Sequence, residues 1–336
     1  MFKTTLILPI AIIFLLLSCS SRQDSPVISF YYWKTSYKLS AEEKKVLEYN
    51  HVNTLYIRYF DIDLDKNQNP YPLSPVVFEQ KIANVKVVPV VYIKNKVMLL
   101  KKPDLKDLAK KVSNYIQQIN NRNGIKSDEI QIDCDWTLES KNNYLGFVKE
   151  LKMASKKRLS ATIRLHQVKY YLKTKIPNVD YGVLMYYNMG KIDADSLNSI
   201  YDKNIADKYL SSLKNYPLDL DVALPIFSWG MQIRNNKVIN LISKINIKSL
   251  ESDSNYSAQA NHFFLVKQSN IKFGNYFKEN DRIKIEFVSF NHLKEMANDL
   301  SHMMRKKPRN IIFYDLDSTN LKNYDDENFK KIINYF

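Results

Sequence analysis

The chain is poor in the residues that build disulfide scaffolds, metal sites and serine-hydrolase sites. Its two cysteines, Cys19 and Cys134, cannot form a disulfide framework. Only one of the five histidines, His166, follows a predicted strand, so we expect no metal site and no cofactor. No serine stands in the sharp strand-to-helix turn of a nucleophile elbow, which argues against Ser-His-Asp catalysis.

The charge of the chain restricts its partners only weakly. Lys+Arg number 50 against 35 Asp+Glu, which gives a net charge of +15. The lysines are scattered through amphipathic segments, and no dense cluster of arginine and aromatic residues occurs, so we expect no nucleic-acid partner. The charge supports a general attraction to anionic lipid or polysaccharide.

The amino terminus predicts export. Residues 1–18 begin with a charged stretch and continue with the apolar run Leu6–Leu17, which is shorter than a membrane span. Leu16-Leu-Ser-Cys19 then resembles the lipobox of bacterial lipoproteins, which implies cleavage before Cys19 and lipidation of its sulfur. An ordinary signal peptide with an incidental cysteine is the alternative. Residues 19–26 form a tether, and we expect a lipid-anchored protein of a bacterial cell envelope, facing the periplasm or the cell exterior, with the outer membrane favoured.

Eight apolar segments alternate with segments of helical spacing in the rest of the chain. They are Val27–Trp33, Val52–Phe60, Val85–Ile93, Glu129–Trp136, Leu159–Leu165, Tyr181–Tyr187, Leu220–Phe227 and Asn310–Asp317. Strands separated by helices pair in parallel, and eight of them close a barrel. We therefore expect a (β/α)8 TIM barrel of the α/β class, a single monomeric domain over residues 27–336 with an excursion at about 235–290.

The fourth segment, Glu129–Trp136, carries two acids on one face. In a strand, Gln131, Asp133, Asp135 and Thr137 all point the same way. Unpaired buried carboxylates cost several kcal/mol, so this strand needs partners, a metal or a substrate. A structural pair held by arginine or backbone N–H groups is the plain interpretation, and a ligand-binding or catalytic cleft is the functional one.

The ends of the predicted strands collect polar and aromatic side chains, whereas their starts show no comparable set. These residues are Trp33, Arg58, Asp61, Tyr92, Asp133, Asp135, Trp136, Arg164, His166, Tyr186, Asn188, Trp229, Asp315 and Asp317. In TIM barrels the active site lies at these ends. Aromatic rings mixed with carboxylates and arginines suit a sugar, which has apolar faces and many hydroxyl groups.

Three of the strand ends carry a family resemblance. They are Ile132-Asp-Cys-Asp-Trp136, Met185-Tyr-Tyr-Asn188 and Leu224-Pro-Ile-Phe-Ser-Trp229. They resemble the family 18 glycoside hydrolases, the chitinase-like TIM barrels, whose fourth strand reads Asp-Gly-x-Asp-x-Asp-x-Glu and whose sixth carries Met-x-Tyr followed by Asp or Asn. If Asp133 and Asp135 fill the second and third acidic positions, Thr137 replaces the proton-donating Glu and Gln131 replaces the glycine. The chain is also similar to an uncharacterised group of bacterial lipoproteins with the same Asp-Cys-Asp-Trp-Thr strand.

Hydrolysis of an extracytoplasmic poly- or oligosaccharide is the first function that these residues suggest. It needs a protonated acid and an opposing carboxylate or substrate acetamido group. Asp135 is the candidate acid, since burial and the neighbouring Asp133 would raise its pKa, and Asp315 or Asp61 would lie across the mouth of the barrel. The side chains expected to orient substrate or water are Tyr186 and Asn188.

A non-catalytic glycan-binding or scaffold lipoprotein that lacks the acid is the alternative. The side chains expected to bind sugar in either case are Trp33, Arg58, Asp61, Tyr92, Trp136, Arg164, His166, Trp229 and Asp317. Carboxyl groups that face each other at roughly 5–10 Å would favour hydrolysis. Acids that are each held by Arg58 or Arg164 would favour structure or binding.

Overall fold

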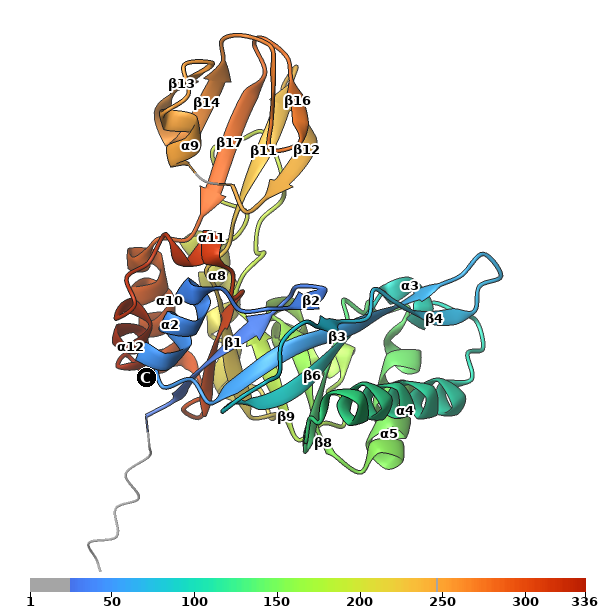
Figure 1. Cartoon of the computed structure of the whole chain (residues 1–336). Coiled ribbons are helices and arrows are strands. Elements are labelled where there is room, and N and C mark those ends of the chain that lie inside the picture. Colours follow the sequence, from blue (N-terminus) through green and yellow to red (C-terminus); the bar gives the residue numbers. More distant parts are fainter. Residues whose placement is uncertain (1–24, 246) are drawn as a thin grey trace, which may run out of the picture.

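Eight parallel strands close into a barrel (Figure 1). The computed structural model describes residues 25–245 and 247–336, so the predicted leader and Cys19 lie outside the described residues. The strands are β1 (Val27–Tyr32), β3 (Thr54–Leu64), β6 (Lys86–Ile93), β7 (Glu129–Asp133), β8 (Arg158–Arg164), β9 (Tyr181–Met185), β10 (Leu220–Pro225) and β18 (Asn310–Tyr314). Each pairs in parallel with the next, and β18 pairs with β1 to complete the ring, which confirms the predicted TIM barrel.

Helices follow most of the strands and cover the outside of the barrel. The longer ones are α2 (Ala41–Tyr49), α4 (Leu105–Asn123), α5 (Lys141–Ser155), α8 (Lys203–Leu210), α10 (Phe290–Met303) and α12 (Asn328–Ile333). The shorter ones are α3 (Asn95–Met98), α6 (Leu165–Lys169), α7 (Tyr171–Thr174), α9 (Lys248–Glu251), α11 (Ser318–Leu321), and the 3-10 turns η1 (Leu213–Asn215) and η2 (Ala260–His262). Helix α2 opens with a capping box, in which Ser40 and Glu43 each accept the other's backbone N–H. Among the described residues, none of the helices is long and apolar enough to cross a membrane.

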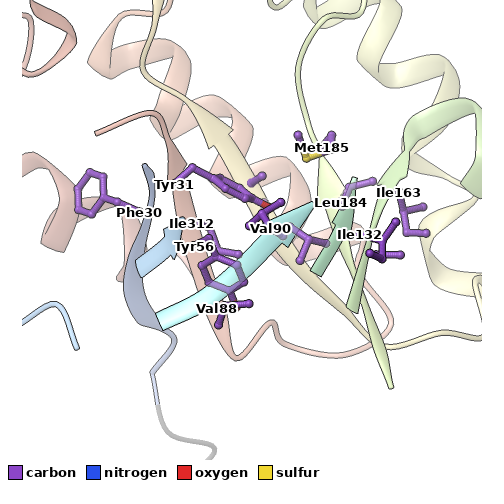
Figure 2. Close-up of a cluster of buried hydrophobic side chains, with 14 of the residues drawn as sticks. Phe30, Tyr31, Tyr56, Val88, Val90, Ile132, Ile163, Leu184, Met185 and Ile312 are labelled. Carbon is purple, nitrogen blue, oxygen red and sulfur yellow. The ribbon is translucent and has the colours of Figure 1, made fainter. Parts of the chain in front are cut away.

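Side chains alternate between the barrel interior and the helical layer. Tyr31 of β1 donates a hydrogen bond to Gln131 of β7 at 2.7 Å, although these strands are not neighbours, so both side chains lie inside the barrel. The intervening apolar residues, such as Ile132, point outward to the helices and form part of the core shown in Figure 2. This alternation fixes which side chain at each strand end reaches the mouth.

The long connection between β10 and α10 folds into a domain of its own, which stands on the carboxyl-terminal end of the barrel (Figure 1). Its antiparallel sheet contains, in spatial order, β12 (Lys237–Ser243), β11 (Ser228–Arg234), β17 (Arg282–Phe287), β14 (Phe263–Val266) and β13 (Tyr256–Ala258). The short hairpin of β15 (Asn270–Lys272) and β16 (Asn275–Phe277) accompanies this sheet. The domain starts at Ser228, earlier than the predicted excursion, so Trp229 belongs to β11 and not to the end of a barrel strand.

A second projection extends from the end of β3. Strand β4 (Pro70–Leu73) pairs antiparallel with Asp61–Leu64, and the resulting hairpin reaches away from the barrel on the side opposite the inserted domain's stalk (Figure 1). Strands β2 (Ser36–Tyr37) and β5 (Val77–Phe78) form a small parallel pair nearby. The carboxyl-terminal mouth therefore lies between two additions to the barrel.

Candidate functional site

The two acids of the fourth barrel strand occupy different environments. Asp133 is the last residue of β7 and is 7% exposed, and its Oδ1 accepts a hydrogen bond from Thr162 at 2.7 Å. Burial raises the pKa of Asp133 to about 6, against the opposing charge of Arg164. The side chain of Asp135 is 48% exposed and forms an ion pair with Arg164. The expectation that Asp135 would be the buried acid is wrong, because the strand ends before it.

The residue that the family 18 resemblance places at the proton donor's position, Thr137, lies in the connection to α5, beyond the end of β7. Since Gln131 is engaged by Tyr31, it serves as a neutral partner inside the barrel.

Half-buried aromatic rings lie together at the mouth, and we call this group the aromatic floor. It consists of Trp33, Tyr314, Phe227 and Trp229, all of intermediate exposure. The ring centroids of Trp33 and Tyr314 are 5.5 Å apart, those of Tyr314 and Phe227 5.7 Å, and those of Phe227 and Trp229 5.3 Å, each pair edge to face. Such an unbroken row leaves part of each ring open to solvent.

Two residues that were predicted to lie at the mouth point outward into the helical layer instead. Trp136 is 2% exposed and stacks on Tyr144 of α5 with centroids 5.2 Å apart. Tyr186 is fully buried beside the ring of Tyr201 in the helical layer. Alternation along β9 explains the second error, because inward Met185 places the next residue outside and Tyr187 inside.

Tyr187 is the residue that the prediction missed on β9. Its ring stacks on Tyr314 at 5.5 Å, so it supports the aromatic floor from below. Asn188 follows it with an exposed side chain and a positive φ of 54°, which an asparagine tolerates better than most residues. Asn188 therefore stays at the rim, and Tyr187 takes the place that was assigned to Tyr186.

The acids around the rim are largely held by cations. Arg58, 7% exposed, contacts both oxygens of Asp61, with Nε to Oδ1 at 2.8 Å and Nη2 to Oδ2 at 2.7 Å. Tyr92 is half-buried near these groups, and burial together with the charges of Asp135 and Asp133 raises its pKa to about 12. His166 is exposed on α6, on the other side of Arg164.

The acids that follow β18 divide into one buried and one paired group. Asp315 is 5% exposed and accepts a hydrogen bond from Asn320 at 2.6 Å, and burial raises its pKa to about 6. Asp317 caps α11 and pairs with Lys244 at 2.8 Å and Lys34 at 3.2 Å. Although burial opposes it, the Lys244 ammonium lowers the pKa of Asp317 to about 2. Asp317 thus has a structural role that the sequence did not indicate.

The inserted domain holds one ring of the aromatic floor in place. The indole Nε1–H of Trp229 donates to Glu286 of β17 at 2.8 Å. Glu286 is 2% exposed, pairs with Lys284 at 2.7 Å and also accepts the backbone N–H of Ser199 at 3.0 Å. No sequence signal links Glu286 to Trp229, since only the register of β11 and β17 brings them together. Among the described residues, His, Cys, Asp and Glu form no group of three placed to hold a metal ion.

Comparison with known proteins identifies structures of the same fold but no relative by sequence. No protein-family model matches the sequence, and no curated protein matches it. Solved structures do match. The spore cortex-lytic enzyme SleL of Bacillus cereus superposes with a TM-score of 0.56 at 13% identity, covering 93% of this chain and 75% of that one.

Chitinases also superpose on nearly the whole chain. The chitinase of Chromobacterium violaceum gives a TM-score of 0.53 at 11% identity, over 93% of this chain and 98% of its own. The class V chitinase of Nicotiana tobaccum, in a complex with NAG4, gives 0.54 at 10% identity, over 92% and 97%. The chain therefore has the fold of the family 18 glycoside hydrolases, as its strand motifs suggested.

Proposed function

We propose that the protein binds a glycan at the carboxyl-terminal mouth of its barrel. The aromatic floor carries this proposal, because partly exposed rings can stack on the apolar faces of sugars. The charged groups beside it, Arg58 with Asp61 and Arg164 with Asp135, offer donors and acceptors to the sugar hydroxyls. Solved structures of the same fold are described as bound to N-acetylglucosamine oligomers, which makes these oligomers the first ligands to test.

The ion pairs favour binding over hydrolysis. Asp135 and Asp61 each form an ion pair with an arginine, Arg164 and Arg58 respectively. While its pair is intact, neither carboxyl group is free to approach a leaving oxygen. Acids held by Arg58 and Arg164 are the arrangement that we expected to favour structure or binding over hydrolysis.

Binding can be tested by calorimetry with chitotetraose and cellotetraose. We expect wild-type protein to bind at least one of them, and Tyr314→Ala to weaken that binding roughly tenfold because the centre of the aromatic floor is lost. Tyr276→Ala is the matched control, since this tyrosine is 57% exposed on β16 of the inserted domain. Equal affinities of wild type and Tyr314→Ala would reject the mouth as the binding site.

Hydrolysis is the second candidate, and Asp133 is the observation that favours it. A buried acid with a pKa of about 6, two residues before an exposed acid, resembles the unequal carboxyl pairs of glycosidases. In this mechanism Asp135 leaves Arg164 when the glycan binds, takes up a proton from water and gives it to the leaving oxygen as the glycosidic C–O bond breaks. The acetamido oxygen of the sugar, or a water molecule, attacks the anomeric carbon, and Asp133 supports Asp135 from below. Mass spectrometry of the incubated tetramers measures turnover. We expect Asp135→Asn to release no shorter sugars, and equal release by wild type and variant would exclude this role.

The predicted lipoprotein signal extends the proposal to a location. A lipid-anchored envelope protein would meet glycans of the cell surface, the periplasm or the surroundings. The signal lies outside the described residues, so it rests on the residues Leu16 to Cys19 alone. In cells, Cys19→Ser should move the protein from the membrane fraction to the soluble fraction, and an unchanged distribution would contradict lipidation.

A further inference from the structure

A groove lined by lysines lies beside the mouth, under the β3–β4 hairpin. It consists of two adjoining cavities of about 470 and 430 Å³, which share Gln68 and Leu100. The cationic residues that line them are Lys66, Lys96, Lys101, Lys102 and Lys111. We call this the lysine groove. Each cavity is large enough for a sugar ring with its substituents.

The acids of the lysine groove are all engaged within the protein. Asp65 accepts the backbone N–H groups of Asn67 at 2.8 Å and Asn69 at 2.7 Å. Asp104 caps α4 by accepting the N–H of Asp107 at 2.9 Å. The side chain of Asp107 pairs with Lys111 at 2.6 Å. Five lysines and three carboxylates line the groove, so its net charge is positive.

Three lysines of the groove stay available. Lys66, Lys101 and Lys102 are exposed, and none of them forms an ion pair among the described residues. Lys96 differs, because it holds Asp63 together with Lys94, each at 2.5 Å. The groove thus presents free ammonium groups from both its walls, the hairpin tip and the α3–α4 connection.

Strand β3 leads from the mouth to the lysine groove. Asp61, which pairs with Arg58, stands opposite Tyr92 of β6 in the sheet register. Three residues further along the same strand, Leu64 lines the groove. At about 3.3 Å per residue, Asp61 and Leu64 are about 10 Å apart along the strand.

From the position of the groove on the same strand as the mouth, and from its charge, we propose that the glycan of the mouth is anionic, and that the lysine groove binds its carboxylate or phosphate groups. The inference rests on the proposed function and names the substrate class for the same site. Lysine acts as a flexible point charge, which suits substituents whose spacing along a polymer varies. A neutral glycan would find hydrogen-bond donors at the mouth and gain nothing from the groove.

Calorimetry with three hexamers tests the inference on the full-length protein. The hexamers are chitohexaose, its 6-O-carboxymethyl derivative and its 6-O-phosphorylated derivative. At low salt we expect at least one charged hexamer to bind roughly tenfold more tightly than the neutral one, and the difference to shrink as salt screens the charges. The derivative that gains more identifies carboxylate or phosphate as the preferred group.

Two charge-reversal variants separate local binding from long-range attraction. K66E/K101E/K102E should abolish the preference and leave the affinity for chitohexaose within about twofold. K126E/K156E/K214E changes the net charge equally with exposed lysines outside the groove, and it should keep the preference. Thermal unfolding confirms that both variants are folded.

The outcomes distinguish the two proposals. If chitohexaose binds but the charged hexamers gain nothing, or if both variants lose the preference equally, the lysine groove has no such role and the mouth remains a glycan site. If none of the three hexamers binds, the proposed function fails together with the inference.

Discussion

The two ends of the barrel contain similar residues in opposite states. At the amino-terminal end, Asp221 is fully buried and accepts hydrogen bonds from the backbone and side chains of both Arg309 and Asn310, at 2.9 to 3.2 Å. The ring of Tyr181 lies beneath two guanidinium groups, those of Arg309 at 4.2 Å and Arg158 at 4.8 Å. These contacts link β8, β9, β10 and the start of β18 at this end of the barrel.

At the carboxyl-terminal end of the barrel, some of the charged and aromatic side chains remain exposed to solvent. Asp135 is half-exposed, and the rings of the aromatic floor are open on one side. The prediction that the strand starts show no comparable set of polar and aromatic residues misses this cluster, because Asp221, Tyr181 and Arg158 all stand at strand starts. Solvent exposure and spare hydrogen-bonding capacity distinguish a binding site from a structural plug, whereas residue type does not.

The largest loss of stability is expected from a substitution in the cluster around Asp221 at the amino-terminal end. Asp221→Ala removes the shared acceptor of Arg309 and Asn310 and should lower the free energy of unfolding by about 4 kcal/mol at pH 7. Asp219→Ala is the control, because this aspartate pairs with Arg305 and Lys306 on the surface and should cost less than about 1 kcal/mol. Urea unfolding measures both, and equal losses would contradict the distinction between the two acids.

The buried acid of the mouth, Asp133, shares one property with Asp221, because burial raises the pKa of both carboxyl groups to about 6. The pKa of Asp133 is raised to about 6, so the folded state binds more protons than the unfolded state between about pH 4 and pH 6. Stability therefore falls as the pH rises through this window. Asp133→Asn removes the titration and still accepts from Thr162, so at pH 8 it should be more stable than wild type by at most about 3 kcal/mol. At pH 4 the two proteins should unfold alike.

Loss of the difference between pH 8 and pH 4 would show that Asp133 is not the titrating group. Asp135→Asn, measured in parallel, should show no such gain because its side chain is half-exposed.

The tryptophans of the mouth test how firmly the aromatic floor is held. Trp229→Phe removes the indole donor to Glu286 and should cost about 1 kcal/mol of stability and several-fold in glycan affinity. Trp33→Phe removes no recorded hydrogen bond and should affect affinity alone. Unfolding and calorimetry of both variants decide the matter, and equal stability losses would mean that the bond to Glu286 contributes nothing.

The smallest effect is expected at the exposed pair of Asp135 and Arg164. Arg164→Gln should lower stability by less than about 1 kcal/mol, because solvent screens one side of the pair. Urea unfolding should therefore show a much smaller loss for Arg164→Gln than for Asp221→Ala. A loss as large as that of Asp221→Ala would place the mouth among the structural parts of the fold.

Much of this arrangement could be predicted from the sequence. Apolar runs separated by helical spacing gave eight parallel strands, and the ends of such strands share one face of a barrel. Asp133, Arg164, Tyr92 and Trp33 were therefore expected together, and contacts or electrostatic coupling link Asp133 with Arg164 and Tyr92.

The errors have two physical causes. Alternation holds only inside a strand, so the directions of Asp135 and Trp136 were undetermined once β7 ended at Asp133. The role of Glu286 depends on pairing between distant strands, which no local pattern encodes. Tyr187 could have been found by counting alternate residues from Met185 along β9.

The position of Val27 has a consequence for how the molecule meets its surroundings. The N–H of this first strand residue donates to the carbonyl of Arg309 at 2.9 Å. Strand β1 therefore begins beside the cluster of Asp221, Tyr181 and Arg309. The preceding segment thus joins the molecule at the pole opposite the aromatic floor. If that segment holds the protein to a surface, the floor faces outward, and long polymers can approach it without being blocked by the attachment.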